Sequence, residues 1–240
     1  MQMGRRILEL RRKKHLKQVD LANTLQLSPQ AVSKWEKDLN APDLAVLPRL
    51  AKLFDVTVDF LLGVDEARPG VFEATVFSSS LRGFAQKALT ADAKELAERT
   101  NVLFQHLTGA VLKFGAVPVK YVGDGFLCFF SGAGHADRAV AAALHAKKTL
   151  EDKNLVIVLN AGDIYLGSIG HVDYASRDIC GDAVNRAFLV APWVSEHCAG
   201  GIGVAESVRR QLRKEMRFKA PRSAAVPLLK AQVTIYEPRT

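Results

Sequence analysis

The sequence predicts two domains of different fold class: an all-α domain over residues 1–62 and a mixed α and β domain over residues 72–240. Three observations predict this division. Short segments with helical periodicity, separated by polar turns, fill the first 62 residues. Gly, Pro and charged residues then cluster over 63–71, which is typical of a linker. Strand-like runs follow over 74–77, 117–122, 126–130, 155–160 and 233–237, and helix-period segments lie between them, notably 92–115, 134–152 and 182–197. This alternation is typical of α/β and α+β proteins.

The composition is that of a globular protein. Of the 240 residues, 48% are hydrophobic and 24% are charged, which excludes disordered, collagen-like and coiled-coil classes. The three cysteines, Cys128, Cys180 and Cys198, form no C-x-x-C pair, so neither a disulfide framework nor a zinc ribbon is predicted. No apolar run approaches the roughly 18 residues of a membrane span, and the N-terminus lacks the apolar stretch of a secretory signal. We therefore expect a cytoplasmic protein with no membrane partner.

Positive charge concentrates in two segments of the chain. The net charge is +8, from 33 Lys and Arg against 25 Asp and Glu. Residues 5–17 carry seven basic side chains and one acidic one, and a second basic stretch runs from Arg209 to Arg222. Such segments bind nucleic acid in some proteins and are solvated helix faces in others, so charge alone leaves both interpretations open.

The third helix of the first domain carries the residues that we expect at DNA. Ser28 and Pro29 predict its start, with Ser as the N-cap and Pro at the first helical position. Apolar residues at helical spacing face the core, and the opposite side is polar. Short polar side chains there can reach base edges, and Lys can reach phosphates. The candidate DNA-binding residues on this helix are Gln30, Ser33, Lys34 and Lys37.

Four stretches over residues 4–62 carry a family resemblance: Gly4-x-Arg6-Ile7-x-x-Leu10-Arg11, Lys17-Gln18-x-x-Leu21-Ala22, Ser28-x-x-x-Val32-Ser33-Lys34-Trp35-Glu36, and Pro42 through Leu62. They resemble the helix-turn-helix domains of the lambda-repressor and Cro type, the XRE family. The resemblance implies an all-α, five-helix domain whose third helix, about 29–37, enters the major groove. It also implies that Gln18 and Gln30 lie at the DNA face, with Ser33 and Lys34 beside them, which adds Gln18 to the candidate DNA-binding residues. Domains of this type bind palindromic double-stranded operator DNA as dimers. The alternative is a domain of this fold that makes only protein contacts.

Three segments of the second domain carry unusual local chemistry. Residues 120–127 have the pattern of a strand, a tight Gly turn and a strand, with Asp124 at the tip, where a carboxylate can bind a divalent cation. Taken alone, Gly-Asp-Gly is more often only a turn. Arg82-Gly83-Phe84 follows a strand and can present backbone amides to a phosphate. The third segment runs from Asp173 to Ala187.

In this order and spacing, together with residues 134–140, 160–163 and 166–170, these segments resemble the class III nucleotide cyclase homology domain over about 71–238. The resemblance implies an α+β, ferredoxin-like sheet with helices on one face. It also implies a head-to-tail dimer with nucleotide sites in the interface. In this family two aspartates hold two divalent ions, an Asn positions the ribose, and an Arg four residues later stabilises charge on the phosphate.

Two catalytic positions of that family hold other residues here. Asp124 matches the second metal aspartate, but the first falls on Ser80, two residues before Arg82, and a neutral hydroxyl replaces a bridging carboxylate poorly. Asn185 matches the Asn, but the Arg position is Leu189, which has no donor. We therefore expect no catalytic residues, with Asp124 and Asn185 as vestiges. The only cofactor that we consider is Mg²⁺ or Mn²⁺ bound with a nucleotide, with Asp124 as the metal ligand.

The two residues that recognise the nucleotide base in this family are both present in this sequence. By the family pattern Lys120 and Asp178 recognise adenine, Lys donating to N1 and Asp accepting from the exocyclic amine. An ion pair between these two residues at an interface is the alternative. The expected ligand-binding residues are Arg82, Gly83, Phe84, Lys120, Asp124, Asp178 and Asn185.

These observations predict a DNA-binding transcriptional regulator. Its degenerate cyclase-like domain would dimerise and sense a nucleotide or a cyclic (di)nucleotide second messenger. Two alternatives stay open. One is an adenylate cyclase tethered to DNA, active as a homodimer despite Ser80 and Leu189 or with an intact partner, and the other is a domain that only dimerises. The expected partners are operator DNA, a second copy of the chain and a nucleotide-type small molecule.

Overall fold

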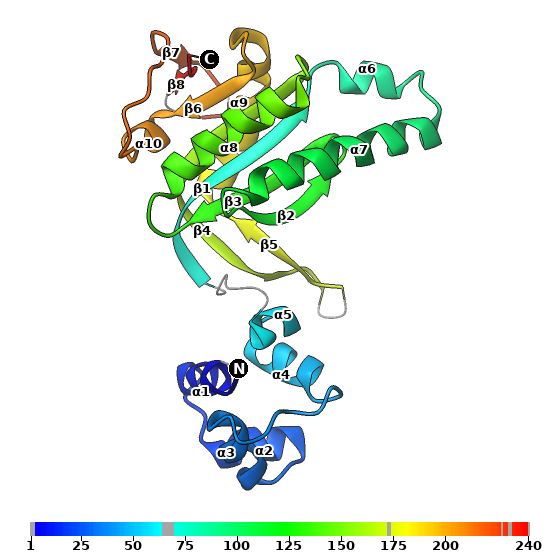
Figure 1. The fold of residues 1–240 in the computed structure, drawn as a ribbon, viewed down its shortest axis with the longest axis vertical. Coiled ribbons are helices and arrows are strands. Elements are labelled where there is room, and N and C mark those ends of the chain that lie inside the picture. The colour runs from blue at the N-terminus through cyan, green and yellow to red at the C-terminus, as the bar shows by residue number, and fades with distance from the viewer. Residues whose placement is uncertain (1–2, 64–69, 172–173, 227, 230–231, 240) are drawn as a thin grey trace. The chain divides into compact units, whose positions relative to one another are not determined.

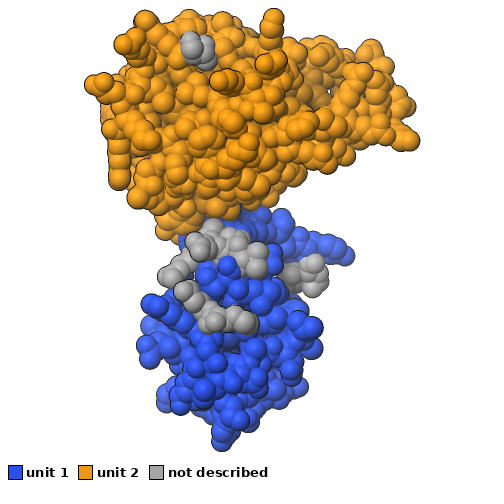
Figure 2. Space-filling view, viewed as in Figure 1, with its two compact units in different colours: residues 1–70, 166–178 blue, residues 71–165, 179–240 orange. Residues whose placement is uncertain are grey.

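The computed structural model describes residues 3–63, 70–171, 174–226, 228–229 and 232–239. Most of the predicted linker, residues 64–69, and Asp173 lie outside the described residues. The chain divides into two compact units, coloured separately in Figure 2: Met1–Gly70 with Leu166–Asp178, and Val71–Tyr165 with Ile179–Thr240. No described helix is long and apolar enough to cross a lipid bilayer.

The first unit contains the five helices that the resemblance implies. They are α1 (Met3–Lys13), α2 (Gln18–Leu25), α3 (Pro29–Glu36), α4 (Leu47–Phe54) and α5 (Val58–Leu62), and Figure 1 shows them in blue and cyan. Ser28 is confirmed as the N-cap of α3, since its side chain accepts a hydrogen bond from the Ala31 amide. Thr57 caps α5 in the same way through the Phe60 amide. Each cap satisfies a backbone donor that has no partner inside the helix.

One apolar cluster holds these helices together. Its fully buried members include Ile7 of α1, Leu21 of α2, Val32 of α3, Leu50 of α4 and Leu61 of α5. Every helix thus contributes its apolar stripe to the same core, which explains how 60 residues of short helices form a stable domain.

A mixed β-sheet, with eight strands within the described residues, lies mostly in the second unit; the end of β4 from Leu166 and most of β5 belong to the first. The strands are β1 (Gly70–Leu81), β2 (Val117–Val122), β3 (Gly125–Ser131), β4 (Leu155–Ile169), β5 (Ser176–Cys180), β6 (Ile202–Ala205), β7 (Arg222–Ala224) and β8 (Val233–Tyr236). Their order is β2-β3-β1-β4-β6-β8-β7, and β5 pairs with β4. β1 runs antiparallel to β3 with Phe77 opposite Cys128, whereas β4 and β6 are parallel.

Helices connect these strands. They are α6 (Phe84–Ala88), α7 (Ala93–Leu112), α8 (His135–Leu150), α9 (Asp182–His197) and α10 (Glu206–Arg209). Helices α7 and α8 lie side by side across one face of the sheet, as Figure 1 shows. This arrangement confirms the mixed α and β class of the second domain.

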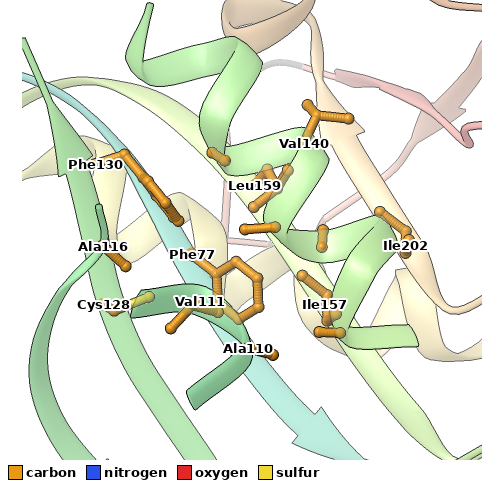
Figure 3. Close-up of a cluster of buried hydrophobic side chains, with 14 of the residues drawn as sticks. Phe77, Ala110, Val111, Ala116, Cys128, Phe130, Val140, Ile157, Leu159 and Ile202 are labelled. Atoms are coloured by element: carbon orange, nitrogen blue, oxygen red, sulfur yellow. The ribbon is translucent and has the colours of Figure 1, made fainter. Parts of the chain in front are cut away.

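The core of the second unit lies between α7, α8 and the sheet (Figure 3). Phe77, Phe130, Ile157 and Leu159 point from the strands, and each is fully buried. The facing side of α8 is lined by small residues, with Ala136, Ala139, Ala142, Ala143 and Ala146 all buried. Small side chains let the helix backbone approach the sheet closely, so the aromatic rings of the strands fill the space between them.

Candidate DNA-binding and nucleotide sites

Helix α3 presents the predicted DNA-binding side chains. Gln30, Lys34 and Lys37 are exposed, and Ser33 is half-buried. Val32 and Trp35, at core spacing on the same helix, are 0% and 5% exposed. The helix is therefore fixed by one face, and its polar face remains open to a ligand. DNA binding by this face stays a prediction, and the exposure of its polar side chains supports it.

Behind α3 lies a charged network that the sequence analysis missed. Arg11 of α1 donates from Nε and Nη2 to the two carboxylate oxygens of Glu36, at 2.5 and 2.9 Å. The two side chains are only 11% and 4% exposed. Arg11 also donates to the Leu16 carbonyl at 2.7 Å. The last turn of α3 is thereby tied to α1 by a bidentate ion pair, the strongest geometry that such a pair adopts.

Gln18 belongs to the same network. Its side-chain amide donates to Glu36 at 2.7 Å, which joins the start of α2 to the end of α3. Burial raises the pKa of the Glu36 carboxyl, but the hydrogen bonds from Arg11 and Gln18, with the charges of Arg11 and Arg12, outweigh it and lower the pKa below its usual value. Gln18 therefore positions α3, and its amide oxygen and second N–H are left for an outside partner. Both Arg11 and Glu36 belong to the family pattern, but they lie 25 residues apart, so no local pattern in the sequence predicts that they pair.

The second candidate site centres on the β2–β3 hairpin. Val122 pairs with Gly125, so Gly123 and Asp124 form a two-residue turn as predicted. Gly123 has φ of +59°, a conformation that favours glycine. The Asp124 carboxylate accepts a hydrogen bond from the Leu81 amide at 2.6 Å. The fold therefore brings Asp124 to the end of β1, beside the position of Ser80.

The residues around Ser80 do not fit the two-metal site that the resemblance implies. Ser80 is half-buried, and its neighbour Ser79 is buried with its hydroxyl accepting from the Phe126 amide at 3.3 Å. Within the described ranges, no group of three or more His, Cys, Asp or Glu side chains could hold a metal ion. One carboxylate, already bonded to a backbone amide, is a poor ligand set for two divalent cations.

Arg82 is turned toward the protein itself. Its guanidinium donates to the backbone carbonyls of Ser195, Lys153 and Cys198, at 2.7, 2.9 and 2.6 Å. Two of these carbonyls lie at the end of α9, where helices leave acceptors without partners. Arg82 therefore ties the end of β1 to the end of α9. Gly83 follows with φ of +69°, and Phe84 begins α6, so this tripeptide turns the chain from β1 into α6. Binding of a phosphate by its backbone amides stays a prediction.

Helix α9 carries the positions of the family's Asn and Arg. Asn185 is exposed, and Leu189 lies one turn later and is half-buried. Arg186, the nearest cation in sequence, donates to Asp182 at 2.5 Å in an i,i+4 pair. The next residue on this stripe is Trp193, whose indole stacks on His197 with centroids 4.4 Å apart. On the face of α9 that carries Asn185, the next two residues are therefore the apolar Leu189 and the aromatic Trp193, whereas the family has a phosphate-binding Arg at the position of Leu189.

The structure does not test the adenine pair. Lys120 lies on β2 in the second unit, opposite Leu127 of β3. Asp178 lies on β5 and is assigned to the first unit. Both side chains are partly buried, and both take part in interactions. Recognition of a base by these two residues therefore stays a prediction.

Comparison with known proteins supports both halves of this description. The family model "Helix-turn-helix" (HTH_3) matches residues 7–61. The chain is 28% identical over 106 residues, 44% of its length, to the HTH-type transcriptional regulator ImmR of Bacillus subtilis (strain 168), covering 76% of that protein.

Two solved structures resemble the second domain. One is the adenylyl cyclase CyaB from P. aeruginosa, with a TM-score of 0.63 and 23% identity, covering 72% of this chain and 97% of the other. The other is the non-canonical dimeric guanylyl cyclase domain of the RhoGC fusion protein from the aquatic fungus Blastocladiella emersonii, with a TM-score of 0.57 and 20% identity, covering 71% of this chain and 97% of the other. At this identity the likeness concerns the fold alone. The chain therefore joins a helix-turn-helix domain of the XRE type to a domain with the fold of class III adenylyl and guanylyl cyclases.

Proposed function

We propose that the protein is a DNA-binding transcriptional regulator whose cyclase-like domain dimerises and binds a nucleotide or cyclic (di)nucleotide without cyclising it. The proposal rests on a contrast between the two domains: the first keeps side chains suited to DNA, whereas the second lacks two groups that cyclisation needs. The exposed face of α3 keeps polar and basic side chains suited to DNA. The cyclase fold keeps Asp124 and Asn185 but has Ser80 and Leu189 where the reaction needs a carboxylate and a guanidinium.

Dimerisation would strengthen DNA binding by the helix-turn-helix domain. One small helix-turn-helix domain buries little DNA surface, and such domains gain affinity by binding two half-sites about one helical turn apart. The cyclase fold supplies a surface that assembles in pairs in at least one similar structure, the dimeric guanylyl cyclase domain. A ligand that binds one arrangement of the dimer more tightly than another favours that arrangement. It can change the operator affinity by no more than the difference between its two binding free energies.

Replacing Lys34 with alanine is expected to weaken operator binding about tenfold, because one phosphate or base contact is lost from each half-site. The operator is first selected from a random DNA pool with the full-length protein, and affinity is then measured by fluorescence anisotropy at fixed salt. Lys52→Ala, which removes an exposed lysine from α4, is the matched control. Equal affinity of the two variants would contradict the placement of α3 in the groove.

A Lys120→Ala, Asp178→Ala double variant is expected to lose its response to adenine nucleotides, because both hydrogen bonds to the base are removed. The measurement is the nucleotide-dependent shift in Tm and in operator affinity of the full chain. Unchanged melting without ligand shows that the variant is folded. A response equal to that of the unmodified chain would place the ligand elsewhere and would contradict the assigned pocket.

A further inference from the structure

The second unit contains an open pocket of about 690 Å³ at the end of α8. Its wall is formed by the last turns of α8, the loop before β4, the start of the α9–β6 connection and the end of β1. It is lined by Arg82, Leu144, Lys147, Lys148, Glu151, Asp152, Lys153, Ala199, Gly200 and Arg239. Five of these side chains are cations and two are carboxylates, so the lining has an excess of positive charge. The volume is within the range of small-molecule sites.

Two of the cations are fixed in place by backbone carbonyls. Lys147 donates to the carbonyls of Asp152 and Leu155 at 2.9 and 2.8 Å, and Arg82 donates to the three carbonyls described above. Carbonyls orient a cation but do not neutralise it, so both charges remain uncompensated by these bonds. Burial and the neighbouring charge of Arg82 lower the pKa of Lys147. Arg82 and Lys147 therefore form a positively charged part of the pocket lining whose side chains are held in place.

The other three cations are available to a ligand. In the part of the chain that the structure describes, the side chains of Lys148, Lys153 and Arg239 form no hydrogen bond or ion pair. All three are exposed. The negative end of α8 favours Lys147 and Lys148 at that position. Lys153 and Arg239 lie outside any helix, so the helix dipole does not account for them.

We propose that this pocket binds a small organic phosphate with at least two negative charges. The cations would hold the phosphate oxygens, Lys148, Lys153 and Arg239 closing on a ligand that rests against Arg82 and Lys147. Glu151 and Asp152 accept hydrogen bonds from hydroxyl or amino groups, so a phosphorylated sugar or nucleoside suits the lining better than a bare anion. The lining shares Arg82 with the predicted nucleotide-binding residues but contains none of Lys120, Asp124, Asp178 and Asn185. The residues predicted to read the base and to bind the metal and ribose therefore lie outside this pocket.

The test is calorimetric titration of the full-length protein with inorganic pyrophosphate and with fructose 1,6-bisphosphate at physiological salt. We expect saturable binding of both probes, tighter for the sugar phosphate. Lys148→Ala, Lys153→Ala, Arg239→Ala is expected to weaken binding tenfold or more, roughly the effect of losing one charge-assisted hydrogen bond. The matched control, Lys87→Ala, Lys94→Ala, Lys113→Ala, removes three exposed lysines elsewhere in the same unit, and it is expected to bind like the unmodified chain.

Three results would overturn the proposal: no saturable binding by the unmodified chain, an equal loss in both triple variants, or no loss in the pocket variant. An equal loss would mean that net charge alone attracts the anion. A Lys120→Ala variant separates the two sites, because it should keep pyrophosphate binding while losing the adenine response. Pyrophosphate binding that disappears in Lys120→Ala would also contradict the pocket.

Discussion

Replacing Arg11 with alanine is expected to lower the free energy of unfolding of the DNA-binding domain by about 3–5 kcal/mol. The substitution leaves the Glu36 carboxylate, 4% exposed, without its cation. Gln18 alone would then donate to it from a side chain. A loss of this size is comparable to the whole stability of many small domains, so the variant should also lose operator binding.

The matched control for this substitution is Arg5→Ala on the same helix. Arg5 pairs with Glu9 at 3.2 Å, but its side chain is 75% exposed. Exposed i,i+4 pairs contribute about 0.3–0.5 kcal/mol, so Arg5→Ala should scarcely change stability. Urea unfolding followed by the fluorescence of Trp35, in a Trp193→Phe background that leaves Trp35 as the only tryptophan, reports on this domain alone. Equal losses from the two variants would contradict the role given to the buried pair.

The pH dependence follows from the lowered pKa of Glu36. A carboxyl whose pKa is lower in the folded state contributes stability above its unfolded pKa, about 4.3, and loses that contribution as pH falls through the folded value. The difference between the unmodified chain and Arg11→Ala should therefore be full at pH 7 and shrink below about pH 4. A difference that is constant from pH 7 to pH 3 would show that the charge of Glu36 is not the cause.

Restoring the two missing catalytic groups is expected to have the other large effect. We expect the unmodified chain to make no cyclic nucleotide from ATP or GTP with Mn²⁺, and the Ser80→Asp, Leu189→Arg double variant to gain activity. One transition-state donor is typically worth about 100 to 1,000-fold in rate, so the gain should reach at least that range. The position of the two groups favours it, since Asp124 in the β2–β3 turn lies beside position 80, where Ser80→Asp would supply the second carboxylate.

The controls identify the restored site. Asp124→Asn in the double-variant background should remove the activity, because the metal then loses one of its two carboxylates. Each single variant should stay well below the double variant, since catalytic groups that act together are not additive. Activity in the unmodified chain would overturn the proposal and favour the cyclase alternative. Silence in both chains would show that more than these two positions has changed.

Local signals in the sequence were sufficient to find many elements. Ser28-Pro29 predicts the start of α3, and the apolar runs predict β2 over Val117–Val122 with the bounds that the structure has. The helix-period segment 182–197 coincides with α9. These signals are caps and hydrophobic periodicity, and both depend only on residues that are close together in the sequence of one helix or strand.

Other elements were missed or shortened. The strand expected over 155–160 continues as β4 to Ile169, through glycines that weaken the strand pattern. The sequence predicts no strand at β5 or β7, and it predicts residues 200–203 as a loop before a strand, whereas β6 already begins at Ile202. Their neighbours in the sheet decide them: β6 pairs with β4 in parallel and with β8 antiparallel. Strand propensity reflects packing against such neighbours more than an intrinsic preference of the backbone.

The sequence by itself determined the fold class of each part, the Ser28 cap of α3, the Gly-Asp turn and the residues that depart from the cyclase pattern at Ser80 and Leu189. The domain bounds at 62 and 72 stay a prediction, and the structure groups Leu166–Asp178 with the first unit. Only the tertiary structure decided that Arg11 closes on Glu36, 25 residues away, and that Arg82 binds carbonyls 113 and 116 residues away. It also decided that five cations from distant segments line one pocket. A cap or a turn is satisfied within a few residues of chain. The partner of a charged side chain is chosen by the whole fold, because a buried or half-buried charge takes whichever acceptor the packing brings within reach.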